Sequence, residues 1–320
     1  MAEELREGTR DGYGRALFEL AEKDRNVVAL DCDLGRSTRS FRISEADPDR
    51  FIELGIAEQD MISTAAGLAS EGKIVFANSF AVFLTGRAYD QIRQQVSLAG
   101  TNVKLCGSSA GITQGPDGAT HQSVTDLSLM RGLPNMTVLV PADARQAELA
   151  VRAAHRKEGP FYIRLSRMLT GLLTGENADF ELGRAQLLRA GTDVALLGTG
   201  PILQEVLVAA EHLNRVGLSA GVYNFHTIKP LDVNCLRKIF GDHRLVITVE
   251  EHSIIGGLGS AVAEMLAELR DQKKKPLLQR LGVQDTFGES GTAEELLKLH
   301  GLDGVSICAA VQQIYREVIR

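Results

Sequence analysis

A glutamate at the start of a helical run is the first residue whose type and place could carry chemistry. Glu58 lies in the stretch ELGIAEQD at residues 53–60, directly before the helical run MISTAAGLASEG. A carboxylate is favoured at the positive end of a helix, so a helix-end charge explains its position. The same group in a dry, apolar site could share or transfer a proton. The residues around Glu58 leave both interpretations open.

The segment at residues 107–122, GSSAGITQGPDGATHQ, is the second candidate. It has no secondary-structure period, and connections of this length are usually functional or disordered. It carries Asp117 and His121, a carboxylate and an imidazole close together in sequence. An imidazole titrates near neutral pH and can act as an acid, a base or a hydrogen-bond donor. A surface turn at residues 116–118, PDG, explains the composition equally well.

Aromatic and basic side chains follow other expected strands. Phe80 and Phe83 can wall a flat ligand, although such a pair is more often part of a core. Arg167 follows a strand at the end where open α/β sheets bind ligands, and arginine binds phosphate with paired hydrogen bonds. The stretch DLGRSTRSFR, residues 33–42, interleaves three arginines with Ser37 and suits either an anion or an exposed loop.

An alternation of strands and helices must position these residues. Short apolar runs have the composition of strands buried on both faces; they lie at 26–31, 73–78, 102–107, 136–141 and 160–165. Amphipathic runs between them have helical spacing; they lie at 9–24, 55–72, 85–100 and 142–159. This alternation predicts a mainly parallel sheet covered by helices on both sides.

The chain of 320 residues is long enough for two domains with separate cores. Residues 168–186 contain turn formers without a sustained helical period, and the α/β alternation restarts after them. The expected fold class is therefore α/β, with two doubly wound domains. We expect the first domain at 1–175, a linker at 176–190, and a smaller second domain at 191–320 with a helical end.

Composition excludes several classes of protein. The net charge is −6 and both signs are mixed along the chain, which argues against nucleic acid as a partner. No apolar run approaches membrane-spanning length and the N-terminus lacks a signal peptide's apolar core, so we expect a cytoplasmic protein with no membrane contact. The cysteines lack metal-ligand spacing and are expected to be buried free thiols; they are Cys32, Cys106, Cys235 and Cys308.

Taken in order, the motifs resemble those of the transketolase family. GIAEQ before a helix, F-x-x-F, D-G-x-T-H-Q, LPNMTVLVPAD and LSR resemble its pyrimidine-binding domain, which uses thiamine diphosphate. The later TIKPLD and VITVEEHSIIGGLGSAV resemble the C-terminal domain shared by deoxyxylulose-phosphate synthase, split transketolases and the beta subunits of 2-oxo-acid dehydrogenases. The resemblance extends over nearly the whole chain from about Gly8.

The resemblance implies a cofactor site. Glu58 would hydrogen-bond the ring nitrogen of the cofactor's aminopyrimidine, because an acid in a dry site can share a proton with it. Phe80 and Phe83 match the aromatic wall around the pyrimidine, and Ile56 of the GIAEQ motif is assigned to the same site. The cofactor would then hold a two-carbon fragment of a ketose as an electron sink.

The resemblance also implies a substrate site. Asp117 matches the acid near the substrate hydroxyls, and His121 matches a catalytic histidine that approaches both substrate and cofactor. Arg167 and Ser37 match residues that contact the substrate phosphate.

Two positions of that substrate site depart from a simple match. Either Arg39 or Arg42 is expected to supply another cation, and the motif does not choose between them. Ser109 stands where transketolases usually have a phosphate-binding histidine. Serine is neutral and short, so the anion site is expected to be weaker or differently built, and to suit another sugar phosphate or anionic ketose.

A missing motif implies a partner. The family binds Mg²⁺ and the diphosphate through a Gly-Asp-Gly motif, and no such tripeptide occurs here. The full-length family places that domain N-terminal to the present one, and few residues precede Gly8. The resemblance therefore implies a second, alpha-type polypeptide that binds the diphosphate and Mg²⁺, no metal ligand in this chain, and an α2β2 tetramer.

The expected function is that of the C-terminal subunit of a split transketolase, which moves a two-carbon ketol unit from a ketose phosphate to an aldose phosphate. One alternative is decarboxylating chemistry on pyruvate, as in deoxyxylulose-phosphate synthase or a 2-oxo-acid dehydrogenase beta subunit. Another is a non-catalytic regulatory subunit, against which the joint retention of Glu58, Phe80, Phe83, Asp117 and His121 argues.

Overall fold

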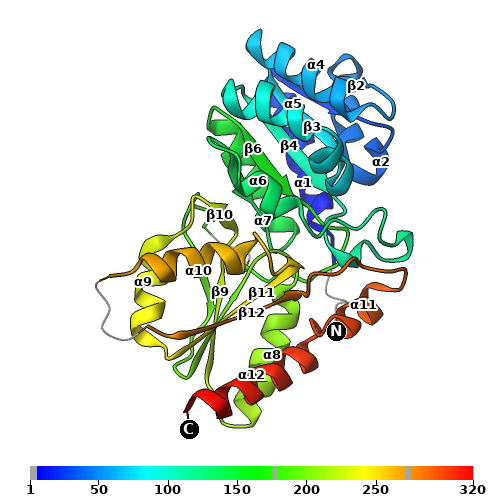
Figure 1. Ribbon diagram of the computed structural model, residues 1–320. Coiled ribbons are helices and arrows are strands. Elements are labelled where there is room, and N and C mark those ends of the chain that lie inside the picture. Colours follow the sequence, from blue (N-terminus) through cyan, green and yellow to red (C-terminus); the bar gives the residue numbers. More distant parts are fainter. Residues whose placement is uncertain (1–5, 176–178, 271–274, 320) are drawn as a thin grey trace.

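The computed structural model describes residues 6–175, 179–270 and 275–319. It has two α/β parts, the upper one blue to green and the lower one largely yellow to red in Figure 1. Residues 1–5 of the expected first domain, 176–178 of the expected linker, and 271–274 and 320 of the expected second domain lie outside the described residues.

The first sheet has seven strands in the order β10-β5-β6-β4-β3-β1-β2. All neighbours are parallel except β10 and β5. Every residue of β1 and β6 is buried, as the continuous apolar runs predict. The strand bounds are β1 Val27–Asp31, β2 Phe51–Glu53, β3 Ile74–Phe80, β4 Val103–Ser108, β5 Thr137–Leu139, β6 Phe161–Arg164 and β10 Thr227–Lys229.

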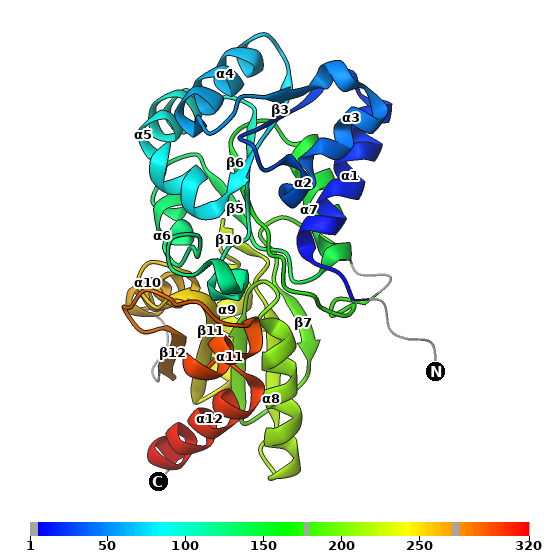
Figure 2. The same cartoon turned by 90° about the vertical axis from the view of Figure 1, so that its right-hand side faces the viewer.

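Helices cover both faces of this sheet (Figure 2). Helices α1 (Thr9–Lys23) and α7 (Ala144–Arg156) pack together on one face, where Gly12 lets them meet, since a Cβ there would lie 1.9 Å from the Ala144 carbonyl oxygen. The other face carries α4 (Glu58–Ser70) and α6 (Asp126–Arg131). Short turns α2 (Gly35–Thr38) and α3 (Ile43–Ala46) join β1 to β2.

The helix predicted at residues 85–100 has an unexpected form. It consists of a π-helical turn at Phe83–Arg87, one α turn at Tyr89–Gln91 (α5), and a second π-helical stretch at Ile92–Leu98. A π turn holds more residues than an α turn, so it changes which side chains face the sheet. Such turns often lie at functional sites, and this segment begins beside the residues singled out from the sequence.

The second sheet has the order β12-β11-β8-β9-β7, with β7 antiparallel to β9 and the rest parallel. Strand β7 lies within the expected linker, at Gln186–Arg189, and continues this sheet at its edge. The other strands are β8 Val194–Gly198, β9 Ala220–Asn224, β11 Leu245–Ser253 and β12 Leu277–Val283. Its helices are α8 Leu203–Arg215, α9 Val233–Asp242, α10 Leu258–Glu268, α11 Ala293–Leu299 and α12 Gly304–Ile319.

The predicted α/β class, with two mainly parallel doubly wound units, is confirmed. The two units are nevertheless joined more closely than separate domains would be. Strand β10 belongs by sequence to the second half, yet it pairs with β5 of the first sheet. The backbone N–H of Val140 also donates to the carbonyl of His226, at 2.8 Å. One hydrophobic core therefore continues from the first sheet into the second.

All four cysteines are free thiols, and the predicted burial is confirmed for three of them, whereas Cys235 is partly exposed. Among the described residues, no helix is both long and apolar enough to cross a membrane.

A buried histidine beside strand β10, where the two units meet, should make the fold sensitive to acid. His226 stacks on Phe180 at 4.3 Å between ring centroids, and burial lowers the pKa of His226 to about 4. Above pH 6.5 the ring is neutral in both states and contributes nothing. As the pH falls from 6.5 to 4 the unfolded chain takes up the proton first, so folding should lose on the order of 3 kcal/mol.

His226→Phe keeps an aromatic ring against Phe180 and cannot be protonated. We expect its free energy of unfolding, measured by urea denaturation from pH 7 to 4, to fall less steeply than that of the wild type. Parallel profiles for the two proteins would contradict this assignment.

Candidate active site

Glu58 is a buried carboxylate at the first turn of α4, with 1% of its surface exposed. The chain turns sharply just before it, at Gly55, whose φ of +68° favours glycine. The Ser79 hydroxyl, from the end of β3, donates to Glu58 Oε1 at 3.2 Å, and Arg87 Nη1 donates to Oε2 at 2.5 Å. A carboxylate accepts about four hydrogen bonds, so Glu58 retains free acceptor sites.

The rings of Phe80, Phe83 and His121 lie together, and Arg87 links them to Glu58. Phe80 and Phe83 are stacked with centroids 6.1 Å apart, and the His121 ring meets Phe83 edge-on at 5.2 Å. The guanidinium of Arg87 lies over the Phe83 ring at 5.0 Å, which links the rings to Glu58. The structure thus brings together the acid, the aromatic pair and the histidine that the sequence singled out.

Ile56 is the other residue of the GIAEQ motif that the sequence assigned to the site. It comes two residues before Glu58 and is 72% exposed. Its side chain is therefore accessible to a ligand or to another chain.

The loop after β4 carries the remaining acid–histidine pair. Ser109, at its start, is buried in the left-handed backbone region with a φ of 54°, which is strained for a residue other than glycine. Asp117 Oδ2 accepts from Gln114 Nε2 at 2.5 Å and lies 3.7 Å from Arg167 Nη1. His121 Nδ1 lies 2.9 Å from the Thr120 hydroxyl, which leaves Nε2 for another partner. The loop therefore connects the aromatic group to Arg167.

A positive cluster forms where α1 begins, and it contains an arginine that the sequence analysis missed. Arg10 Nη1 donates to the carbonyl of Ser37 at 3.1 Å, while its Nε is buried and unpartnered. Burial and then repulsion from Arg39 lower the pKa of Arg10, and Arg167 adds to the effect. Arg10 thus lies between the two residues expected to bind phosphate, Ser37 and Arg167.

The two arginines left open by the sequence each have a carboxylate partner. Arg39 Nε lies 2.8 Å from Asp11 Oδ1, and Arg42 Nε lies 3.5 Å from Glu45 Oε2. Arg39 remains close enough to Arg10 to affect its charge. Arg39 and Arg42 therefore both stay predicted cations, and Arg10 joins them by its position beside Ser37.

Known protein families match both halves of the chain. Residues 8–171 match the family model for the transketolase pyrimidine binding domain, and residues 183–307 match that for the transketolase C-terminal domain. This chain belongs to the transketolase family. The predicted resemblance, to the C-terminal section of a split transketolase, is confirmed.

Several transketolase subunits align over nearly their whole length. The 6-deoxy-6-sulfo-D-fructose transketolase subunit SqwH of Clostridium sp. (strain MSTE9) is 44% identical over 95% of this chain and 94% of that protein. One subunit of the apulose-4-phosphate transketolase of Phocaeicola vulgatus is 35% identical over 96% of this chain and 97% of that protein. A solved split gene transketolase, an inactive beta4 tetramer, is 41% identical with a TM-score of 0.87, covering 98% of this chain and 99% of that one.

In this member of the transketolase family, Asp31 holds the turn that bears Ser37. The carboxylate accepts from the Thr38 and Ser40 hydroxyls, both at 2.7 Å, and from the Leu34 N–H at 2.8 Å. Burial raises the pKa of Asp31 to about 6, although these hydrogen bonds oppose the rise. No sequence signal indicated this role, because Asp31 ends an apolar run like many strand-end residues.

A buried charge network closes the base of the loop that bears Asp117 and His121. The Arg164 guanidinium donates to Asp126 Oδ2 at 2.7 Å, and to the carbonyls of Ser123 and Glu251 at 3.2 and 2.9 Å. Burial raises the pKa of Asp126, but the charges of Arg164 and His252 and the hydrogen bonds from Arg164 and Tyr162 together outweigh burial, so the pKa is lowered. Arg164 therefore ties the loop to strand β11 of the second sheet.

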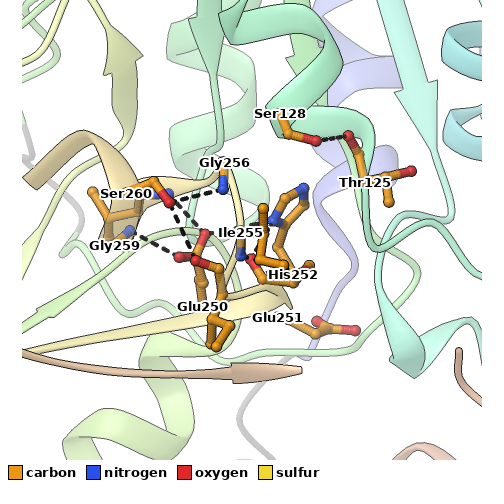
Figure 3. A network of polar contacts seen from close by, with 12 residues as sticks. Thr125, Ser128, Glu250, Glu251, His252, Ile255, Gly256, Gly259 and Ser260 are labelled. Carbon is orange, nitrogen blue, oxygen red and sulfur yellow. Dashed lines mark hydrogen bonds and ion pairs between the residues drawn. The ribbon is translucent and has the colours of Figure 1, made fainter. Parts of the chain in front are cut away.

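Glu250, Glu251 and His252 of β11 belong to the polar group drawn in Figure 3. Glu250 accepts from the N–H groups of Leu258 and Gly259, both at 2.8 Å, and burial raises the pKa of Glu250 to about 7. Burial lowers the pKa of His252 to about 4. Among the residues that the structure describes, no group of three or more His, Cys, Asp or Glu side chains could hold a metal ion.

Arg164→Met should be strongly destabilising, because it leaves the Asp126 carboxylate buried without its cation. We expect a loss of about 3–5 kcal/mol in the free energy of unfolding, measured by urea denaturation, and partial recovery when Asp126→Asn is added. Arg145→Met is the matched control, since Arg145 pairs with Glu148 at the surface and should cost less than about 1 kcal/mol. Equal losses in the two single variants would contradict the role of the buried pair.

Proposed function

We propose that this chain is the pyrimidine-binding subunit of a two-polypeptide transketolase. It would transfer a two-carbon ketol unit from a ketose phosphate, or an equivalent anionic ketose, to an aldose phosphate. One observation carries the proposal: in a chain of this family, the buried carboxylate of Glu58 lies within the same group of side chains as Phe80, Phe83 and His121.

The side chains fit the pyrimidine end of thiamine diphosphate. Glu58 has free acceptor sites for a ring nitrogen and its proton, Phe83 offers an aromatic face, and Ile56 can close over the ring. When bound, the cofactor supplies the acidic carbon and the electron sink that ketol transfer needs. Ser79 and Arg87 orient Glu58, so that its proton is held at the pyrimidine nitrogen.

The substrate side uses the loop and the positive cluster. The free Nε2 of His121 donates to, or accepts from, a substrate oxygen, and the half-exposed Asp117 accepts from a hydroxyl group. Arg10, Arg167 and Ser37 bind the substrate's terminal anion.

This positive cluster supports an anionic substrate that carries either a phosphate or a sulfonate. Two relatives are named for 6-deoxy-6-sulfo-D-fructose and apulose-4-phosphate, which carry a sulfonate and a phosphate. Because the neutral Ser109 side chain is buried, the arginines would supply the charge that binds the anion.

A second polypeptide completes the enzyme in this proposal. The Gly-Asp-Gly motif that would hold the diphosphate and Mg²⁺ is absent from the sequence, and a relative covered almost completely is described as a split gene transketolase. The exposed Ile56 beside Glu58 gives the partner a place to cover the site. Two copies of each chain would give an α2β2 assembly.

The first test is the reaction itself. The chain is mixed with an alpha-type partner that carries the Gly-Asp-Gly motif, thiamine diphosphate and Mg²⁺, and is then given phosphorylated and sulfonated ketoses with an aldose phosphate acceptor. We expect ketol transfer, measured as the appearance of the shortened aldose. Release of CO₂ from pyruvate without ketol transfer would instead place the chain with the decarboxylating enzymes.

Glu58→Gln tests the proton role. The amide keeps the shape of the side chain but cannot hold a proton at the pyrimidine nitrogen, so kcat should fall by about 10²–10⁴-fold, with exchange of the cofactor's acidic C–H slowed to match. Asp60→Asn removes an exposed carboxylate from the same helical turn and is the matched control. A fully active Glu58→Gln protein would show that the role is misassigned.

A further inference from the structure

The loop at residues 110–123 is held from outside its own sheet. Its base is closed by the N–H of Gly111, which donates to the carbonyl of Ser123 at 2.9 Å. Between these two residues the loop carries Asp117 and His121, whose side chains make mainly contacts within or beside the loop. Leu165 and Arg164 of the first half hold its two ends, and two further buried contacts come from the second half of the chain.

The first such contact is a carboxylate from β11. Glu251 is 2% exposed, and its Oε1 accepts from the backbone N–H of Thr113 at 2.6 Å. The carboxylate also lies against Gly111, where a Cβ would come within 2.2 Å of Oε1. A carboxylate that binds a buried N–H makes one of the stronger hydrogen bonds in a protein, so the loop is fixed where it leaves the sheet.

Glu250 and Glu251 are adjacent but serve different elements. Figure 3 shows their side chains pointing in different directions, as expected of neighbours on a strand. Glu250 binds the start of α10, whereas Glu251 binds the loop. The two residues therefore provide an internal comparison.

The second contact lies at the other end of the loop. The Gln122 amide nitrogen donates to the carbonyl of Glu289 at 2.9 Å, and to the loop carbonyls of Ile112 and Gly115. Gly288 leaves room for it, because a Cβ there would lie 1.8 Å from Gln122 Oε1. Segment 288–289 of the second domain thus binds the residue that directly follows His121.

We propose that the second domain positions the loop at residues 110–123, called the substrate loop below, through Glu251, which is a positioning residue for Asp117 and His121. The acidic side chain acts on the loop's backbone and leaves the loop's own side chains free for the substrate. The role of the loop in substrate binding rests on the proposed function. The contacts that hold the loop do not depend on it. Glu251 gives the second domain a role in the site through the backbone of the loop.

Hydrogen exchange in the full-length chain tests this without any assay of activity. Glu251→Ala should speed the exchange of backbone amides in peptides covering residues 110–123, on the order of tenfold or more, while strands β8 and β9 keep their protection. Glu251→Gln retains an acceptor for the Thr113 N–H and should restore most of the protection. Glu250→Gln, the matched control, should leave exchange in the loop at the wild-type rate.

Glu251→Ala could fail to fold, and Glu251→Asp is therefore a second test of the same contact. The aspartate keeps the carboxylate charge, but its side chain is one methylene too short to reach the Thr113 N–H. In the assembled enzyme, Glu251→Asp should raise the KM for the ketose by about tenfold and leave the affinity for thiamine diphosphate unchanged.

Two results would overturn the proposal. One is a loop that stays protected in both Glu251→Ala and Glu251→Asp. The other is equal loss of loop protection in the Glu250→Gln control. If the wild-type complex shows no ketol transfer, the proposed function fails, and the exchange experiment still decides whether Glu251 holds the loop.

Discussion

The rest of this structure depends on one buried guanidinium. Arg164 is removed from water at the end of β6, and such a charge is tolerated only when its donors are paired. Its partners are the Asp126 carboxylate, the end of the substrate loop and the backbone of β11. Because one side chain must satisfy all three, the loop and the second sheet are fixed in the same place relative to the first sheet. Glu251 then acts on the loop from that fixed strand.

The site has two chemically different parts. Glu58, Phe80 and Phe83 form a buried acid and an aromatic wall, which suit a flat, weakly basic ring. Arg10 and Arg167 form a half-buried positive cluster, which suits an anion. The loop that carries Asp117 and His121 contacts both groups, so under the proposed function one backbone segment would couple substrate binding to the proton chemistry at the ring.

Much of this could be predicted where the signal is local. Continuous apolar runs predicted the buried parallel strands, and motif order placed Glu58, the aromatic pair and His121 in one site. The π-helical form of residues 83–98 was not predicted, because an i→i+5 pattern resembles an α-helix over so short a run. Strand β10 was missed because three residues joined to a distant sheet carry no period of their own.

The sequence by itself determined the residue types: an acid at a helix start, an aromatic pair after a strand, and a loop with an acid and a histidine. Only the tertiary structure decided their partners. Arg10 entered the positive cluster because the start of α1 lies against the segment after β6, and Arg87 reached Glu58 through a π turn. Contacts between residues far apart in the chain depend on how sheets and helices pack, and no local pattern of residues records that packing.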